Sequence, residues 1–236
     1  MASKKTVIEE IKDNFLLVAS HQLKLPLNTM RLNLEMVLNG DLGKINRKVR
    51  ANITEALKVN TKCLELVSDF LNASALEKES SGPKEKPFDL LATIKDVIKE
   101  TEILARQHRV KIKFLVTPKK AKHFMASAKY FSEVVKNLLS NAIKYNRDGG
   151  TVEISLKKSA GKASLSIQDS GIGIPLKDQK KLFGKFFRAD NAMRSATEGS
   201  GLGLFIVKSY VEKWGGKIFF KSTEGQGTTF FIEIPL

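Results

Sequence analysis

Apolar side chains repeat with helical spacing through the first third of the chain. One run advances by alternating steps of four and three residues, the heptad spacing of a helix that packs along one seam. Its members are Val49, Ile53, Ala56, Asn60, Cys63, Val67 and Phe70, and Asn60 is the polar member. An earlier repeat of seven predicts another helix and comprises Ile11, Val18, Leu25 and Leu32.

A short polar segment, residues 39–46, separates these predicted helices and allows an antiparallel hairpin. The first helix carries further apolar positions beside its repeat, namely Phe15, Leu16, Leu23, Met30 and Val37. A lone hairpin cannot bury apolar residues on more than one side, whereas two copies in a four-helix bundle can. We therefore expect residues 1–79 to form an all-α hairpin that makes a homodimer.

The pattern changes after a polar segment that contains glycine and proline, and we interpret residues 80–87 as a linker. Beyond it, 3.6-residue periodicity predicts helices at 88–107, 126–146 and 202–215. Alternation predicts strands at 109–116, 151–158, 162–169, 216–222 and 227–235. Helices combined with mostly antiparallel strands predict a two-layer α+β sandwich over residues 88–236.

Composition narrows the choice of partner and location. The net charge is +15, but the lysines are scattered and the aromatic residues do not alternate with basic ones, so we expect no nucleic-acid ligand. Nucleotides or an acidic protein surface suit this charge better. A single cysteine excludes an internal disulfide, and no apolar run is long enough to cross a bilayer. We expect a cytoplasmic chain with no membrane segment of its own.

Polar residues lie on one side of the helix predicted at 126–146. Asn137, Asn141 and Lys144 follow each other at steps of four and three, and Tyr145 comes next. An amide oxygen is a hard ligand that suits Mg²⁺ on phosphate oxygens, and a lysine can meet phosphate as a point charge. Taken alone, this stripe is more typical of a solvated helix face than of a binding site.

Two glycine-rich segments follow the same helix. Asp169 ends a predicted strand, and Gly171 and Gly173 after it allow backbone to approach a flat base. The second segment directly precedes a helix whose first N–H groups favour phosphate, and its glycines are Gly199, Gly201 and Gly203. Between the two, residues 182–197 have little pattern, as expected of a lid, and contain Arg188.

Four motifs in this order, "NLLSNAIKY", "DSGIGIP", "LFGKFFR" and "GSGLGLFIV", closely resemble the ATP-binding domain of sensor histidine kinases. The segment "SHQLKLPL" is similar to the dimerisation and phosphoacceptor hairpin of the same kinases. The resemblance extends from about residue 11 to residue 235. It implies a four-helix bundle followed by the Bergerat ATPase fold that gyrase, Hsp90 and MutL share. The sequence holds no sensor domain, and we interpret it as the catalytic core of a longer protein.

The resemblance implies which residues would bind the adenine base. Asp169 would accept from the adenine amino group, Gly171 and Gly173 would shape the pocket, and Thr228 would line it.

The phosphates would lie beside the polar helix stripe. Asn141 would bind Mg²⁺, Asn137 and Lys144 would lie beside the phosphates, and Tyr145 would pack near the nucleotide. Arg188 would contact the γ-phosphate. The residues implied to close over the phosphates are Gly199, Gly201, Leu202 and Gly203.

His21 is the implied phosphoacceptor, whereas His108 and His123 have structural interpretations. A histidine has a neutral, nucleophilic ring nitrogen near neutral pH. Pro26, five residues on, removes the backbone bond to the carbonyl of Gln22, and we interpret it as a bend that lets the bundle flex.

Two residues depart from the family pattern. Gln22 replaces the acidic residue that often follows the acceptor, so we expect it to orient the ring without taking the proton and to slow phosphorylation. Leu25 replaces a Thr or Asn that helps to orient water, so we expect weak phosphatase activity toward a partner.

The sequence therefore predicts an ATP- and Mg²⁺-dependent protein-histidine kinase. It would phosphorylate His21 and pass the phosphoryl group to an aspartate in the receiver domain of a response regulator. Two alternatives remain open: a signalling scaffold that binds ATP with little phosphotransfer, and an ATP-driven clamp that hydrolyses ATP without phosphohistidine.

Overall fold

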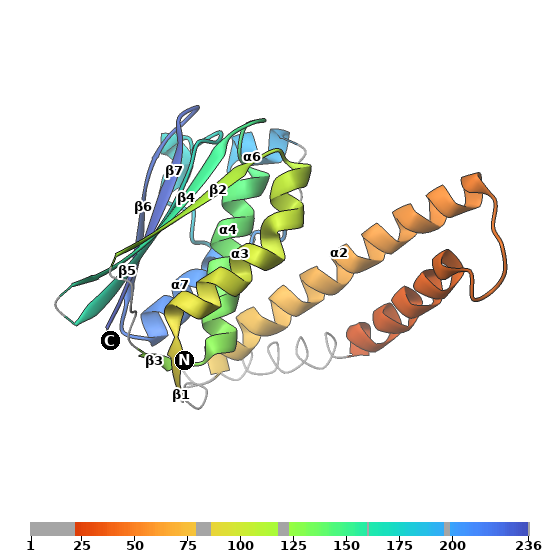
Figure 1. Cartoon of the computed structure of the whole chain (residues 1–236), viewed down its shortest axis with the longest axis horizontal. Helices are drawn as coiled ribbons and strands as arrows, with labels where there is room; N and C mark the ends of the chain where they lie inside the picture. The colour runs from red at the N-terminus through yellow and green to blue at the C-terminus, as the bar shows by residue number, and fades with distance from the viewer. Residues whose placement is uncertain (1–21, 79–85, 118–122, 160, 196–198, 236) are drawn as a thin grey trace, which may run out of the picture. The chain divides into compact units, whose positions relative to one another are not determined.

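The computed structural model describes residues 22–78, 86–117, 123–159, 161–195 and 199–235 (Figure 1). The chain divides into two compact units, Met1–Lys78 and Glu79–Leu236, which are described separately below. His21 lies outside the described residues. Within those residues, no helix combines the length and the apolar character needed to cross a membrane.

The first unit is a pair of helices. The described part of the first helix covers residues 22–39 and continues through Pro26, and α2 covers Arg47–Lys78. The side chain of Asn46 begins α2, because its Oδ1 accepts a hydrogen bond of 2.9 Å from the backbone N–H of Val49. The polar turn between the helices is short, as the sequence predicts.

The least exposed face of α2 contains most of the predicted seam. The members of the repeat that are partly or fully buried are Ile53, Asn60, Cys63, Val67 and Phe70, and Leu57 and Leu64 beside them are partly buried as well. Ala56 is exposed, and Val49 is 39% exposed. A single hairpin covers one flank of a broad apolar surface, which explains why the rest of the repeat is left open.

The first helix is likewise apolar on more sides than the hairpin covers. Leu25 is 71% exposed and Leu32 is 54% exposed within one chain. Both belong to the seven-residue repeat that predicts this helix. The repeat therefore marks a surface of the hairpin that α2 leaves uncovered.

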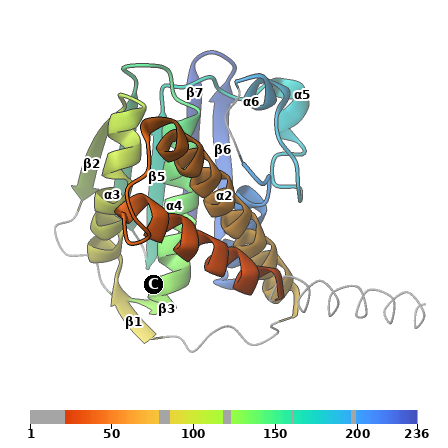
Figure 2. The same ribbon diagram turned by 90° about the vertical axis from the view of Figure 1, so that its right-hand side faces the viewer.

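The second unit is the predicted two-layer α+β sandwich. A five-stranded sheet has the order β2-β4-β5-β7-β6, in which β2 pairs parallel with β4 and the other pairs are antiparallel. Its strands are β2 (Lys111–Thr117), β4 (Thr151–Ser159), β5 (Lys162–Asp169), β6 (Lys217–Thr223) and β7 (Gly227–Pro235). Three helices cover one face: α3 (Leu90–Gln107), α4 (Ala128–Lys144) and α7 (Gly203–Lys213) (Figures 1 and 2).

Alternation along β5 sets the position of the candidate site. Ala163, Leu165, Ile167 and Asp169 are buried, and the residues between them are more exposed. The first three fill the core between the sheet and the helices. Asp169 continues the inward-facing series, so the fold places a carboxyl group at the end of an apolar row.

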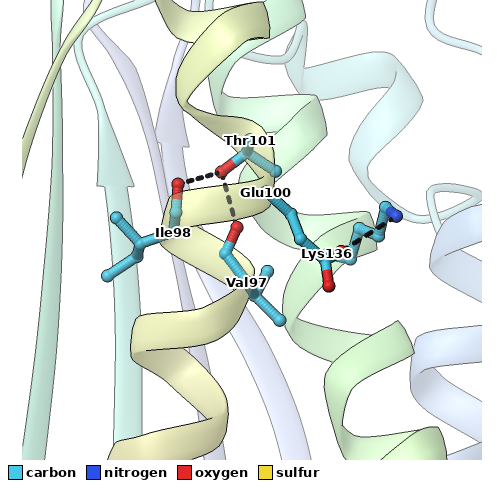
Figure 3. A network of polar contacts seen from close by, with 5 residues as sticks. All are labelled: Val97, Ile98, Glu100, Thr101 and Lys136. Atoms are coloured by element: carbon cyan, nitrogen blue, oxygen red, sulfur yellow. Dashed lines mark hydrogen bonds and ion pairs between the residues drawn. The ribbon is translucent and has the colours of Figure 1, made fainter.

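Packing between α3 and α4 holds the helical layer together (Figure 3). Thr101 is buried in α3, and its hydroxyl donates within the helix to the carbonyls of Val97 at 2.9 Å and Ile98 at 3.1 Å. An ion pair of 3.2 Å joins Glu100 of α3 to Lys136 of α4. Because this pair is exposed, buried apolar packing rather than the charge pair stabilises the contact.

Two short strands were missed by the sequence interpretation, which placed part of them in the linker and part in a helix. β1 (Lys86–Asp89) pairs antiparallel with β3 (His123–Ala126). Each has four residues, too few for a visible alternation. Phe88 of β1 lies 5.4 Å from Phe131 of α4, measured between ring centroids, so aromatic packing reinforces the pair.

The two histidines for which the sequence predicts structural roles lie at the end of a helix and at the start of a strand. His108 follows α3 at its carboxyl end and is exposed. His123 is the first residue of β3.

Candidate active site

A buried carboxylate is the centre of the candidate site. Asp169 is 9% exposed at the end of β5. Its Oδ1 accepts hydrogen bonds from two backbone N–H groups, that of Gly171 at 2.8 Å and that of Thr228 at 3.1 Å. Because both bonds end on Oδ1, Oδ2 has no hydrogen bond from the residues that the structure describes. A donor from outside the protein can satisfy Oδ2.

Burial also changes the acidity of this group. Loss of solvation raises the pKa of the Asp169 carboxyl from 3.8 to about 6, although the N–H groups of Gly171 and Thr228 lower it. The carboxyl therefore stays ionised at neutral pH, and it takes up a proton in mildly acidic solution. Perturbed acidity of a buried group is typical of a functional site.

Glycines bring backbone close to this carboxylate. A Cβ on residue 171 would lie 2.1 Å from the carbonyl oxygen of Tyr145 and 2.9 Å from Asp169 Oδ1. Gly173 has a φ of +63°, and a Cβ there would lie 2.0 Å from the carbonyl oxygen of Thr223. Any side chain at either position would displace the loop that carries Asp169.

The end of α4 is joined to the same loop. Tyr145 follows α4, and its carbonyl accepts a 3.0 Å hydrogen bond from the backbone N–H of Ile172. Asn137 and Asn141 lie on α4 and are partly exposed, as is Lys144 in its last turn. The structure thus connects the helix carrying these polar residues to the loop after Asp169.

The second glycine segment approaches the same helix. A Cβ on Gly203, the first residue of α7, would lie 2.8 Å from Oδ1 of Asn137. A Cβ on Gly199 would lie 3.6 Å from the hydroxyl oxygen of Tyr145. The start of α7 and the polar side of α4 therefore face one another. N–H groups at the start of a helix suit an anion, and a side-chain amide oxygen suits a bound cation.

Leu202 and Gly201 hold the start of α7 in place. Leu202 is buried, and its N–H donates to the hydroxyl of Ser200 at 3.2 Å. Gly201 has a φ of +70°, and a Cβ there would lie 2.7 Å from the carbonyl carbon of Phe186. Because residue 201 is a glycine, the backbone before α7 can pass directly against the backbone of Phe186.

The predicted lid is more ordered than its sequence suggests. It contains α6 (Asp190–Arg194), and α5 (Leu176–Gln179) precedes it. Asp190 binds the two elements together, because its N–H donates to Asp178 Oδ2 at 2.9 Å and its carboxylate pairs with Lys177. Helices of four and five residues are too short to show a helical period, so the sequence pattern does not predict them.

Arg188 belongs to the same segment. Its Nη2 donates to the carbonyl of Ala192 at 3.2 Å. This hydrogen bond of the guanidinium lies within its own segment, and the expected contact with a terminal phosphate remains a proposal.

Several polar residues at the site were missed by sequence reasoning. Ser222 of β6 accepts from the N–H of Ile174 at 2.8 Å and contacts the Thr228 hydroxyl at 2.8 Å. Asn191 donates to the carbonyl of Gly173 at 2.9 Å. Ser222 alternates inward with Phe220, which is the signal that could have identified it.

Thr228 is buried, as a residue lining a pocket should be, and it donates its N–H to Asp169. The described residues contain no cluster of three or more His, Cys, Asp or Glu side chains. A metal bound with few protein ligands would take the others from a substrate and water, as Mg²⁺ does on a phosphate chain.

The raised pKa of Asp169 predicts a pH-dependent stability. Between about pH 4 and 6 the folded protein holds a proton that the unfolded chain has lost, because the pKa rises from 3.8 to about 6. The contribution is full below pH 4 and disappears as pH rises through 6, which lowers the free energy of unfolding by about 3 kcal/mol. Urea unfolding followed through Trp214, the single tryptophan, measures it.

Asp169→Asn is the matched control for this titration, because it keeps the shape and removes the ionisable group. Its unfolding free energy should lack the component that falls between pH 4 and 6. Parallel pH curves for the native protein and the variant would contradict the assignment.

Two family models match the chain. The model described as His Kinase A (phospho-acceptor) domain matches residues 11–79. The model described as histidine kinase-, DNA gyrase B- and HSP90-like ATPase matches residues 126–236. The first match contains His21, and the second contains every residue of the site described above.

Individual relatives agree with these models. The circadian input-output histidine kinase CikA of Synechococcus elongatus is 32% identical over 95% of this chain, and the chain spans 30% of its length. The structure of a mycobacterial sensor histidine kinase, MprB, is 30% identical with a TM-score of 0.54, covering 64% of this chain and 97% of that one. Histidine kinase ThkA in complex with the response regulator protein TrrA is 22% identical with a TM-score of 0.63, covering 98% of this chain and 66% of that one. At that identity the last comparison supports the fold alone.

Proposed function

Because the chain belongs to the sensor histidine kinases, we propose that it transfers the γ-phosphoryl group of ATP to His21 and then to an aspartate of a response regulator. The proposal covers the catalytic core, which spans about a third of the length of the relative CikA. It assigns residues 1–79 to dimerisation and phosphoacceptance, 80–87 to a linker and 88–236 to ATP binding. It places the reaction in the cytoplasm, where ATP is available.

One observation carries the proposal. A buried carboxylate with an unused oxygen lies in a glycine-lined loop that is hydrogen-bonded to the end of the helix bearing Asn137 and Asn141. This arrangement has a recognition group for an amine at one end and polar groups for an anion at the other, as a purine nucleotide requires.

The base occupies the end near Asp169. Its exocyclic amino group donates to Asp169 Oδ2, which is ionised at neutral pH because the pKa is about 6. Gly171 and Gly173 leave space for a flat ring, and Thr228 lines the pocket. Such a charge-assisted hydrogen bond is stronger than one between neutral groups.

The phosphates extend toward α4 and the start of α7. Asn137 and Lys144 lie beside them, Tyr145 packs near the nucleotide, and the backbone of Gly199, Gly201, Leu202 and Gly203 closes over them. Asn141 would hold Mg²⁺, which would neutralise charge on the phosphate oxygens. Arg188 would supply a further positive charge to the γ-phosphate.

His21 attacks through a neutral ring nitrogen. A nitrogen–phosphorus bond forms at the γ-phosphorus while the bond to the β,γ-bridging oxygen breaks, and ADP leaves with that oxygen. The ring then loses the proton of its other nitrogen to water or buffer, and Gln22 orients the ring by accepting from that N–H with its amide oxygen. Alignment supplies most of the rate in such transfers.

The partners follow from the same scheme. The helical hairpin forms a homodimer, since it leaves Leu25 and Leu32 exposed in one chain. The phosphohistidine passes its phosphoryl group to an aspartate carboxylate of a receiver domain. ThkA, which shares the fold, was solved in complex with the response regulator protein TrrA.

Incubation with γ-labelled ATP and Mg²⁺ tests the proposed kinase. We expect acid-labile, alkali-stable label on the protein, which is the signature of phosphohistidine. Label that appears only as free phosphate would overturn the proposal in favour of an ATP-driven clamp.

A second candidate function is a signalling scaffold that binds ATP with little phosphotransfer. Gln22 favours it, because an amide in the position after the acceptor cannot take a proton. Leu25 favours it as well, because its side chain cannot orient water. Nucleotide binding without any label over hours would establish the scaffold.

The substitution Gln22→Glu is expected to raise the initial rate of autophosphorylation by roughly ten- to a hundredfold. A carboxylate can accept the ring proton, and general-base help contributes about 10²–10⁴-fold at most. Gln107→Glu, an exposed position in α3, makes the same change of charge away from the histidine and should leave the rate unchanged. Equal rates for the native protein and Gln22→Glu would exclude this role for residue 22.

A further inference from the structure

Three polar side chains lie side by side at one end of the sheet, on the face that the helices cover. They come from neighbouring strands: Asp169 from β5, Thr228 from β7 and Ser222 from β6. Thr228 is paired with Ser222, and its N–H donates to Asp169. The next row of the sheet on the same face is apolar and comprises Ile167, Phe230 and Phe220. The polar row therefore ends the core at the candidate base pocket.

Asp169 offers this pocket only an acceptor. Its Oδ1 already accepts from the N–H groups of Gly171 and Thr228. Its Oδ2 has no hydrogen bond from the described residues, and it is not among their fully covered side-chain atoms that lack a partner. Oδ2 is therefore accessible to a ligand. An ionised carboxylate has no proton to donate to that ligand.

The hydroxyl group of Ser222 makes three contacts with a single proton. It accepts from the N–H of Ile174 at 2.8 Å, it donates to the carbonyl of Gly227 at 3.1 Å, and its oxygen lies 2.8 Å from the hydroxyl oxygen of Thr228. A carbonyl oxygen can only accept, so the proton of Ser222 is used on Gly227. All three contacts are hydrogen bonds at once only if Thr228 donates its own proton to Ser222. The hydroxyl oxygen of Thr228 then has only lone pairs left for another group.

We propose that Ser222 is a positioning residue that holds the hydroxyl of Thr228 as an acceptor, and that this selects a base with an amino group over one with a carbonyl group. The inference rests on the proposed function, which places a purine nucleotide beside Asp169. Asp169 Oδ2 and Thr228 Oγ1 are then both acceptors toward the base. The exocyclic amino group of adenine has two protons, one for each. A carbonyl group at the same position meets two acceptors and no donor.

Binding of ADP and IDP tests this selection, because the two differ only at this edge of the base and neither has a γ-phosphoryl group to transfer. The native protein should bind ADP at least about tenfold more tightly than IDP. In Ser222→Ala the proton of Thr228 is free to turn toward a carbonyl group. The ratio of the IDP to the ADP dissociation constant should therefore fall at least about fivefold. Isothermal titration measures both constants.

The ratio separates this role from a purely structural one. Ser222→Ala also leaves the N–H of Ile174 without its acceptor, and damage to the loop would weaken the binding of both nucleotides by the same factor. Ser222→Thr keeps the hydroxyl group and should keep the native ratio. Ser166→Ala is the matched control, because it removes a hydroxyl group from the opposite face of the sheet in β5. It should bind both nucleotides as the native protein does.

Thr228→Val gives an independent test, because it keeps the shape of the side chain and removes the acceptor. It should bind ADP about five- to tenfold more weakly and IDP no more weakly than the native protein. Adding Ser222→Ala to this variant should leave the ratio unchanged, since the hydroxyl that Ser222 positions is gone.

Three results would overturn the inference: an unchanged ratio in Ser222→Ala, an equal loss of ADP and IDP binding in Thr228→Val, or a native protein that binds IDP as tightly as ADP. Failure of the native protein to bind either nucleotide would instead overturn the proposed function.

Discussion

Asp169→Asn is expected to weaken ATP binding by about a hundredfold or more. The amide oxygen can still accept from the N–H groups of Gly171 and Thr228, so the loop keeps its shape. In place of Oδ2 the variant presents an NH₂ group, and two donors then face one another at the base. The loss combines a charge-assisted hydrogen bond with an unpaired buried donor. Isothermal titration with a non-hydrolysable ATP analogue measures it.

The nucleotide itself offers a control for this prediction. Inosine triphosphate carries an oxygen acceptor where adenine has its amino group. It should therefore bind the native protein poorly and lose less affinity than ATP on Asp169→Asn. Unchanged ATP affinity in a variant that still unfolds cooperatively would remove Asp169 from the base pocket.

His21→Gln is expected to remove all protein-bound label from γ-labelled ATP, a loss of at least about a thousandfold, since no other group supplies the nucleophile. ATP affinity should not change, because the substitution leaves the α+β unit intact. The measurement is a time course of acid-labile label beside a binding titration of the same sample. Persistent label at the native rate would mean that another residue is the phosphoacceptor.

These two variants together determine which chain phosphorylates which. A mixed dimer of His21→Gln and Asp169→Asn has one intact nucleotide site and one histidine, on different chains. Label in the mixture, on the chain that retains His21, would show transfer across the dimer. Absence of label would show transfer within one protomer.

Periodicity predicts the large elements well because each buries one face. The helix expected at 126–146 is α4, Ala128–Lys144, and the strand expected at 162–169 is β5, Lys162–Asp169. Short elements depend on partners that are distant in the chain, which no local pattern contains. β1 and β3 are the example. β1 has only four residues, and the packing of its Phe88 against Phe131 of α4 stabilises it.

The seam of α2 shows a second limit. The predicted repeat combines residues that pack inside the hairpin, such as Ile53, with residues that one chain leaves open, such as Ala56. A heptad repeat reports burial without stating which chain provides it. The sequence therefore predicts that the surface is covered, whereas the structure separates the part covered by the hairpin from the rest.

At the site, the motifs locate residues that are close in the sequence and miss those that arrive from elsewhere. Asp169, Gly171 and Gly173 follow one another, and the structure brings them together. Ser222 and Asn191 support the same loop from 48 and 18 residues away, through bonds to Ile174 and Gly173. The alternation of Ser222 with Phe220 along β6 marks Ser222 as inward-facing without indicating its partner, and the neighbours of Asn191 give no sign of its role.

The dependence of Asp169 on the N–H of Thr228 limits where this chain can be cut. All four signature motifs end before the carboxyl end of α7, yet the strand that supplies Thr228 begins at Gly227. A fragment that stops after α7 would carry every motif and lack one wall of the pocket. Motif content alone therefore overstates the nucleotide-binding capacity of truncated genes and fragments of such domains, and the last strand is the part to check first.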